Sequence, residues 1–263
     1  MKYLQISSCT VGAVGLLCKA FLRWGCKEVK VEGLDVLVKA LEDKSRRDNG
    51  TGILTVCNHI SVLDDPLIWG VMPTYTYFDP NLSRWTLGAS DIIFTNPLFG
   101  VFFRTGQVFE TFRGGGIYQT AVDDAIRTLD DGRWIHIYPE GKINQPCYNP
   151  AGGLFPFKWG MGRMIMEAKS MPIIIPMWIT GTDQVMPEPR YFPNKFPVPG
   201  NRLSITFSHD PKLNDAVGDI RAQWLARGRP EAETANTRSR VTARIKDSVQ
   251  ALRNRIQAAS STR

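Results

Sequence analysis

The sequence predicts an α/β fold in which a central, mostly parallel sheet is flanked by helices. Strand-like and helix-like segments alternate from about residue 28 to residue 210, which is the rhythm of α/β proteins. The chain has 263 residues, 43% of them hydrophobic, so it is large enough to bury one sizeable core.

Four apolar segments predict strands of this sheet. They lie at residues 52–59, 134–141, 172–181 and 202–208, and the first of them ends at His59. Asp65 and Pro66 then predict the N-cap and the first residue of a short helix. Apolar residues at four-residue spacing predict a longer helix over residues 117–129, and another is expected over residues 160–169.

Three regions are expected along the chain: a membrane-interface segment (1–27), a central α/β domain (28–211) and a basic helical tail (212–263). In the first region, the apolar stretch 9–18 is too short to cross a bilayer, and no run of eighteen uncharged apolar residues exists. Lys19 and Arg23 follow it together with bulky apolar side chains, which predicts a monotopic helix inserted shallowly at an anionic membrane surface. A buried amphipathic helix is the alternative.

The tail carries eleven Lys and Arg against five Asp and Glu, and therefore most of the net charge of +7. Apolar residues recur in it every three or four positions, at Val241, Ile245, Val249, Leu252 and Ile256. This spacing predicts a basic amphipathic helix. Such a helix can dock on the domain, pair with a partner helix, as in a homo-oligomer, or lie on anionic lipid.

The positive charge indicates an anionic partner: nucleic acid, a phosphorylated substrate or an anionic membrane. No nucleic-acid-binding motif is present, so no nucleic-acid partner is expected. The five cysteines form no C-x-x-C pair and the three histidines are far apart in sequence, so no metal site is expected. His136 falls in the middle of a predicted strand, where a structural role is expected.

The stretch "CNHISVLDDPL" places His59 five residues before Asp64. In a continuous helix these side chains would point roughly 140° apart, so only a turn between strand and helix can bring them together. An aspartate that accepts a hydrogen bond from one ring nitrogen leaves the other nitrogen as a base. The alternative is that the two aspartates only cap the helix.

Two further motifs end at predicted element boundaries. Arg113 and the glycines that start at Gly114 come directly before the helix predicted at Ile117, an arrangement that suits a phosphate group. The alternative is a flexible turn. Glu140 and Gly141 follow a strand, at the position where α/β proteins gather functional groups.

Taken in order, these motifs resemble the four-block pattern of the glycerolipid acyltransferases. The blocks are H-x4-D (His59, Asp64), an arginine-glycine step (Arg113, Gly114), [FY]-P-E-G over residues 138–141, and an apolar strand carrying Pro176. The resemblance covers residues 10 to 210. Asp65 and the "FKWG" block, which contains Lys158, favour those members that remodel mitochondrial cardiolipin.

The resemblance implies roles for individual residues. His59 would be a general base that deprotonates a lysophospholipid hydroxyl for attack on an acyl ester, and Asp64 would orient it. Arg113 would hold substrate phosphate. The full expected substrate-binding set is Asn58, Asp65, Arg113, Gly114, Glu140, Gly141, Lys158 and Pro176.

The activity implied is a coenzyme A-independent transacylase without a cofactor. It would move acyl chains from phospholipids to lysophospholipids, chiefly monolysocardiolipin, at a mitochondrial membrane facing the intermembrane space. An acyl-coenzyme A donor, a hydrolase and a non-catalytic lipid-binding module are the alternatives. No G-x-S-x-G elbow is present, and Cys57 and Ser61 lack a nucleophile motif.

Overall fold

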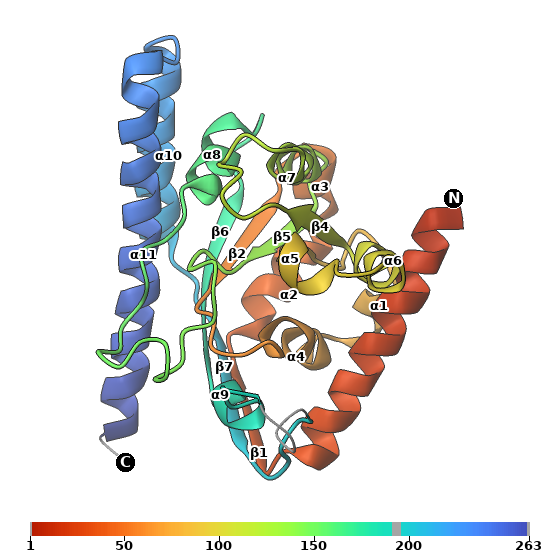
Figure 1. The fold of residues 1–263 in the computed structure, drawn as a ribbon. Helices are drawn as coiled ribbons and strands as arrows, with labels where there is room; N and C mark the ends of the chain where they lie inside the picture. Colours follow the sequence, from red (N-terminus) through yellow and green to blue (C-terminus); the bar gives the residue numbers. More distant parts are fainter. Residues whose placement is uncertain (1, 191–195, 262–263) are drawn as a thin grey trace.

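A seven-stranded sheet forms the centre of the molecule, in the order β1-β7-β6-β2-β5-β3-β4 (Figure 1). The computed structural model describes residues 2–190 and 196–261, with side chains for 6–190 and 196–259, so the outermost residues of both predicted terminal segments lie outside the description. Five of the six strand pairings are parallel, and only β6-β7 is antiparallel. The predicted mostly parallel α/β sheet is confirmed.

Four of the strands were predicted from the sequence, and three were not. The strands are β1 (Glu28–Glu32), β2 (Ile53–Cys57), β3 (Trp85–Ala89), β4 (Val108–Thr111), β5 (Trp134–Ile137), β6 (Ile173–Thr180) and β7 (Arg202–Phe207). β2 and β5 end earlier than predicted, because the chain leaves the sheet at both points to form turns. Of the unpredicted strands, β1 and β3 alternate between more and less buried residues, so they carry no continuous apolar run.

The helices surround the sheet, and several short ones among them were not predicted from the sequence. They are α1 (Lys2–Ala20), the π-helical η1 (Phe21–Gly25), α2 (Leu34–Glu42), α3 (Lys44–Asp48), α4 (Asp64–Val71), the 3₁₀-helical η2 (Thr74–Phe78), α5 (Ser90–Ile93), α6 (Pro97–Thr105), α7 (Thr120–Asp130), α8 (Gly160–Glu167), α9 (Thr182–Val185), α10 (Pro211–Ala226) and α11 (Glu231–Ser261). α4 begins at Asp64, not at Pro66, and Leu63 is its N-cap. α7 begins at Thr120, not at Ile117, because the Gln119 side chain accepts from Phe112 N and folds the glycine loop back.

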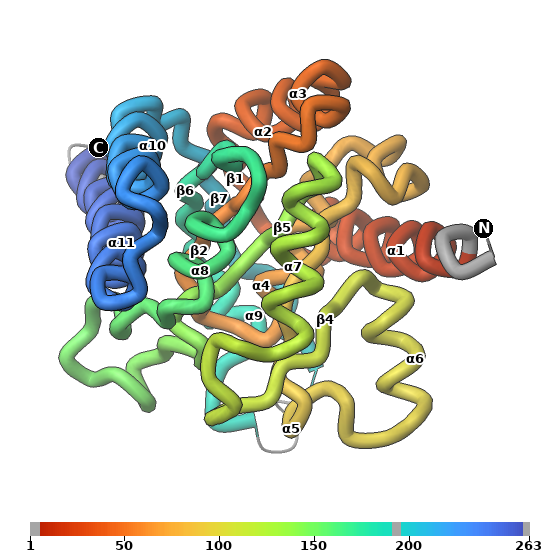
Figure 2. The backbone as a smooth tube through the Cα atoms, turned by 90° about the horizontal axis from the view of Figure 1, so that it is seen from above, coloured from red at the N-terminus to blue at the C-terminus, as the bar shows by residue number. Residues whose placement is uncertain are grey.

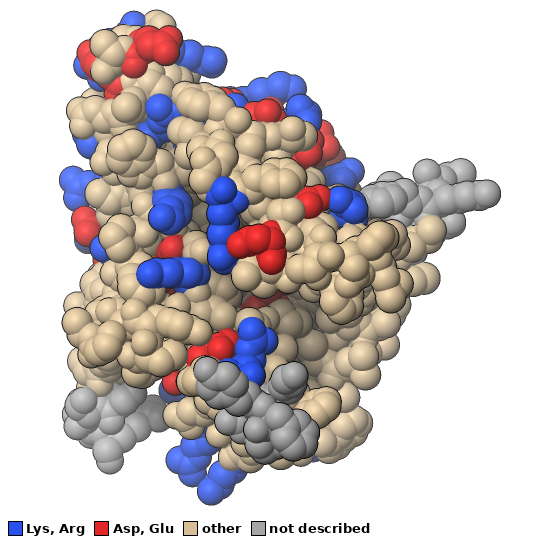
Figure 3. Space-filling model, in the orientation of Figure 1, with Lys and Arg blue, Asp and Glu red and all other residues tan. Residues whose placement is uncertain are grey.

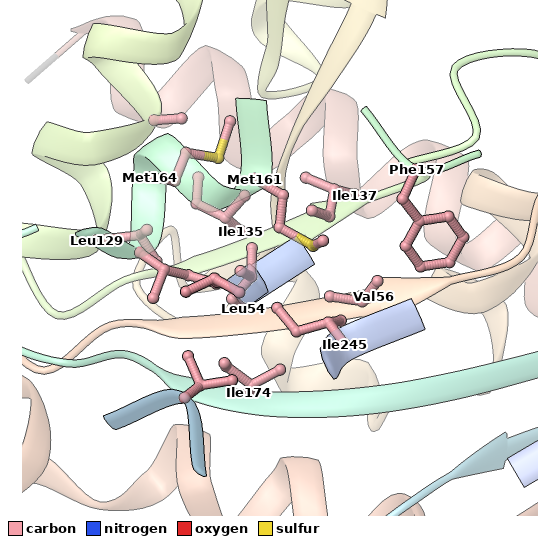
Figure 4. Packing of buried hydrophobic residues seen from close by; sticks show 14 of the residues in the cluster. Leu54, Val56, Leu129, Ile135, Ile137, Phe157, Met161, Met164, Ile174 and Ile245 are labelled. Atoms are coloured by element: carbon pink, nitrogen blue, oxygen red, sulfur yellow. The ribbon is translucent and has the colours of Figure 1, made fainter. Parts of the chain in front are cut away.

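The tail docks on the domain. Figures 1 and 2 place α10 and α11 on one face of the sheet and α1 on the other. Val241, Ile245 and Val249 of α11 are fully buried in one cluster with Leu54 and other strand residues, and Figure 4 shows Ile245 among them. α8 approaches α11 so closely that a Cβ added at Gly162 would lie 2.8 Å from the carbonyl oxygen of Arg238. The apolar stripe of the tail therefore belongs to the core.

One flank of α1 is covered by the domain. Val11 and Leu22 are buried, and α1 packs against α4 and η2. By length and composition the helical stretch Ile6–Gly25 is able to cross a membrane. The uncharged run before Lys19 alone predicted a segment too short to do so, and the helix is longer than that run.

We predict that the tail is needed for the stability of the whole domain. Ile245→Ala should lower the free energy of unfolding by about 2–5 kcal/mol, because it opens a cavity at a fully buried position. Arg244→Ala, at the exposed neighbouring position, should change it by less than about 0.5 kcal/mol. Urea unfolding checks both variants, and an unchanged midpoint for Ile245→Ala would show that α11 is independent of the core.

Candidate active site

The expected site residues gather where three neighbouring strands end. Residues 58–64 follow β2, residues 138–141 follow β5, and Thr182 follows β6; β2 pairs in parallel with both of the other strands. The carboxyl ends of adjacent parallel strands are the usual place for ligands in open α/β sheets. The fold therefore brings segments more than a hundred residues apart to one point.

His59 and Asp64 are in direct contact. Nδ1 of His59 lies 2.9 Å from Oδ2 of Asp64, so the turn expected between strand and helix is present. Because a carboxylate only accepts hydrogen bonds, Nδ1 carries the proton and Nε2 is left with a free lone pair. The His59 side chain is 21% exposed, so it can be reached from outside.

The carboxylate of Asp64 is completely buried and fully hydrogen-bonded. Besides His59, its Oδ2 accepts from the backbone N–H of Ile60 and of Ser61, at 2.6 and 2.8 Å. Oδ1 accepts from the Thr182 hydroxyl. Asp64 is also the first residue of α4, where the helix dipole favours a negative charge. These four donors hold the carboxylate in one orientation.

Thr182 was not found by sequence reasoning. It lies 118 residues from Asp64 along the chain, in no recognised motif, and only the parallel pairing of β2 with β6 brings it near. A buried hydroxyl that donates to a carboxylate makes a charge-assisted hydrogen bond, which is stronger than a neutral one.

Tyr138 supports the imidazole ring of His59. The two rings stack with centroids 4.4 Å apart and an interplanar angle of 29°. The ring of His136 makes an edge contact with the ring of Tyr138. The Tyr138 hydroxyl is buried without a hydrogen-bond partner among the described residues, and burial raises its pKa well above the ordinary value. The aromatic residue of the third block therefore fixes the plane of His59.

His136 is a buried residue of β5, as expected. Its Nδ1 lies 2.6 Å from Oγ1 of Thr55, which in turn accepts a hydrogen bond from Trp134 Nε1 at 2.8 Å. Burial, with the nearby Arg84 charge as a further cause, lowers the pKa of His136 to about 3. His136 is therefore neutral at physiological pH.

Glu140 holds the backbone around His59 in place, and its expected role in substrate binding stays a prediction. Its Oε1 accepts from His59 N at 3.0 Å, and its Oε2 accepts from Phe155 N at 2.9 Å and from Asn144 Nδ2. Burial raises the pKa of Glu140. Since these internal donors occupy both oxygens, Glu140 links the segment after β5 to the segment after β2.

Asp65 likewise has an internal partner. Arg84 Nε donates to its Oδ1 at 2.9 Å, and Arg84 NH2 contacts its Oδ2. The buried guanidinium of Arg84 also lies 3.9 Å from the Trp69 ring centroid and donates to Gly106 O at 2.9 Å. Asp65 therefore links α4, through Arg84, to the chain before β4, and its expected role in substrate binding stays a prediction.

Asn58 and Pro176 also have structural roles, and their expected roles in substrate binding stay predictions. The Asn58 amide donates to Ile179 O at 2.9 Å and accepts from Ile179 N at 2.8 Å, so it extends the pairing of β2 with β6. Pro176 is buried inside β6, opposite Val56, and its carbonyl accepts from Ser208 N. Neither residue has a free polar group for a substrate.

Arg113, Gly114, Gly141 and Lys158 are all exposed. Arg113 and Gly114 follow β4, three strands from β2 and hence about 14 Å from it. Arg113 pairs with Asp91 at 3.3 Å, an ion pair exposed on both sides. The glycines do not precede a helix directly, so the expected helix N-terminus is missing from this segment; the side chain of Lys158 lies beside Gly141.

The two residues that flank His59 and carry nucleophilic atoms are poor nucleophiles. Cys57 is fully buried, and burial raises the pKa of its thiol well above the ordinary value. Ser61 is also fully buried, and its hydroxyl accepts from Leu63 N at 3.2 Å. The geometry therefore favours a base that activates an external hydroxyl over a covalent intermediate.

The sequence profile of the family described as "Acyltransferase" matches residues 28–180 of the chain. The chain belongs to the acyltransferase family. The acyltransferase is 39% identical over 208 residues to the protein named "Taffazin" of Dictyostelium discoideum, covering 78% of this chain and 67% of that one. It is thus a tafazzin homologue within the glycerolipid acyltransferases.

Two other proteins are similar to this acyltransferase. The N-acylphosphatidylethanolamine synthase of Arabidopsis thaliana is 40% identical over 163 residues, which cover 62% of this chain and 55% of that one. The 1-acyl-sn-glycerophosphate acyltransferase PlsC of Thermotoga maritima shares the fold, with a TM-score of 0.54, 20% identity, and coverage of 94% of this chain and 79% of that one. The chain spans between 55% and 67% of the length of the curated relatives it matches.

We predict that the Thr182 hydroxyl positions Asp64 in this acyltransferase. Thr182→Val should lower kcat for acyl transfer by about tenfold and leave KM nearly unchanged, since 1.4 kcal/mol of lost positioning corresponds to that factor. Thr180→Val is the control, because its hydroxyl makes no hydrogen bond to Asp64 and lies in the same segment. Equal losses in both variants would argue against this role.

We also predict that His136 makes the acyltransferase sensitive to acid. From its ordinary pKa of 6.5 down to about 3, the unfolded chain binds a proton at His136 that the folded chain excludes. Stability should therefore fall with decreasing pH in this window, by up to about 1.4 kcal/mol per pH unit. Urea unfolding at pH 6, 5 and 4 should give a shallower dependence for His136→Gln, and parallel profiles would contradict the assignment.

Proposed function

We propose that the chain is a coenzyme A-independent transacylase that moves acyl chains between phospholipids and lysophospholipids, chiefly to remodel cardiolipin from monolysocardiolipin. The observation that carries this proposal is the His59–Asp64 pair, which leaves Nε2 of a partly exposed imidazole free to act as a base. The similarity to proteins named tafazzin supports the choice of reaction.

In the proposed reaction, Nε2 of His59 takes the proton of a lysophospholipid hydroxyl as that oxygen attacks the ester carbonyl of a donor phospholipid. The tetrahedral intermediate collapses, the bond to the donor's glycerol oxygen breaks, and His59 returns the proton to that oxygen. The donor leaves as a lysophospholipid. Asp64 stabilises the imidazolium that forms between the two steps.

We propose that Arg113, Gly114, Gly141 and Lys158 contact the substrate. Arg113 and Lys158 carry the charge that a phosphate needs, and the exposed Arg113–Asp91 ion pair costs little to open. The distance of about 14 Å between β2 and β4 suits a substrate whose phosphate is held away from its reacting hydroxyl.

We further propose that the protein attaches to a mitochondrial membrane on one leaflet through α1, facing the intermembrane space. Lipid substrates that reside in a bilayer require an enzyme at its surface. The exposed flank of α1 and its length and composition support this attachment.

The experiment that tests the reaction mixes wild-type protein with labelled monolysocardiolipin and phosphatidylcholine vesicles in the rigorous absence of coenzyme A. Wild type should form cardiolipin and lysophosphatidylcholine in step. His59→Ala should reduce this transfer by about 10²–10⁴-fold, the usual contribution of a general base. His209→Ala, at an exposed position, is the control for loss of a histidine.

Other products would identify other reactions. Transfer that begins only after acyl-coenzyme A is added would replace the proposed donor. Free fatty acid without an acceptor would indicate a hydrolase. Acylation of the amine of phosphatidylethanolamine would favour the activity named for the Arabidopsis thaliana relative.

A further inference from the structure

The short helix α6 exposes a large apolar surface that packing within the domain does not explain. Leu98 is 75% exposed and Val101 is 61% exposed, and Phe99 and Phe102 are exposed as well. Only Gly100 and Thr105 of this helix are buried. A contiguous group of exposed large apolar side chains marks an interaction surface, because hydration of these groups is unfavourable.

The helix α1 lies beside α6 and extends this surface. The Thr10 hydroxyl of α1 donates to the Thr105 hydroxyl of α6 at 3.1 Å, and Figures 1 and 2 both show the two helices as neighbours. On the flank turned away from the domain, α1 exposes Leu17 to 71%, and Trp24 of η1, which continues α1, is 81% exposed. We call the combined surface the apolar face of α1 and α6.

Charges are arranged around the apolar face as a bilayer would require. On the face drawn in Figure 3, the described surface over α6 is mostly uncharged. The one charged residue of α6 is Arg104 in its last turn, and its guanidinium pairs with Glu110. Lys19 lies in the last turn of α1, and Arg23 and Trp24 lie in η1, which follows it directly. Cations that reach headgroups from an apolar stem and a Trp at the same level are typical of a membrane interface.

We propose that α6 inserts into the same leaflet as α1, so that the apolar face of α1 and α6 is a two-element membrane foot. This inference extends the attachment by α1 proposed above. Insertion is driven by burial of apolar side chains in lipid, so it does not require anionic headgroups. The basic tail makes no contribution, because α11 covers the opposite face of the sheet from α1.

The foot also fixes where the site lies relative to the bilayer. α4 begins with Asp64 and packs directly on α1: a Cβ added at Gly70 would lie 2.9 Å from a backbone atom of Cys18. An insertion of α1 and α6 therefore holds the His59–Asp64 pair at a fixed depth, since α4 cannot move away from α1 without breaking this contact.

The test is flotation of the full chain with neutral phosphatidylcholine vesicles at high salt. The double variant Leu98→Ser/Val101→Ser should lower the partition coefficient by about tenfold or more, because it removes two large apolar side chains from the lipid contact. The matched control, Arg240→Ser/Arg244→Ser, removes two exposed charges of α11 and should stay within about twofold of wild type. Thermal unfolding should be nearly unchanged in both, since all four positions are exposed.

Two results would overturn the foot. One is that the α6 variant floats with the vesicles as well as wild type does, or that the α11 variant loses as much of its partition coefficient as the α6 variant. The other is that wild type forms a dimer in solution, whereas the α6 variant is a monomer that floats as well as wild type. That result would assign the apolar face to contact with a second copy of the chain. Acyl transfer in detergent-dispersed lipid separates this inference from the proposed function. The rate of transfer by the α6 variant should there remain within about twofold of the wild-type rate. An inactive wild type would reject the proposed function, and flotation would still decide whether α6 inserts into the leaflet.

Discussion

The buried carboxylate of Asp64 is the constraint on which the rest of the site depends. A charge without partners in the protein interior costs several kcal/mol, so the chain must supply donors to it. The donors come from the turn after β2 and from Thr182 after β6. Satisfying one carboxylate therefore closes the turn, starts α4 and fixes the exit of β6. The imidazole of His59 is oriented as a consequence.

A second buried acid completes the placement of His59. Glu140 accepts from the backbone N–H of His59, whereas Asp64 accepts from its ring, and Tyr138 stacks on the ring plane. The residue is thus held from three directions, and Nε2 is the position that these contacts leave open. Asp64 and Glu140 hold the base and do not themselves react. This role explains why both acidic residues of the motifs are buried.

The sequence predicted the parts of the site that are local and missed those that are not. His59 and Asp64 meet within one turn, so their spacing sufficed, whereas Thr182 depends on strand pairing and has no local signal. Polar residues at strand ends were expected to bind substrate, but residue type alone does not show whether a side chain faces a ligand or the backbone. Glu140 faces the backbone. The strands with a continuous apolar run, such as β2 and β5, were predicted for the same reason as the His59–Asp64 turn: their pattern is contained in a few neighbouring residues.

The two ends of the chain show why net charge was a weaker guide than apolar pattern. From the sequence, the N-terminal segment and the basic tail were both candidates for membrane contact, since both combine cations with apolar residues. The fold separates them, because the apolar stripe of α11 fills the core on one face of the sheet, whereas α1 leaves an apolar flank open on the other face. An apolar stripe that packs in the core is not available for contact with a membrane or another partner. Where the core has already covered it, the charges beside it form an ordinary solvated surface, and where the core has not, as on α1 and α6, the surface still requires a partner.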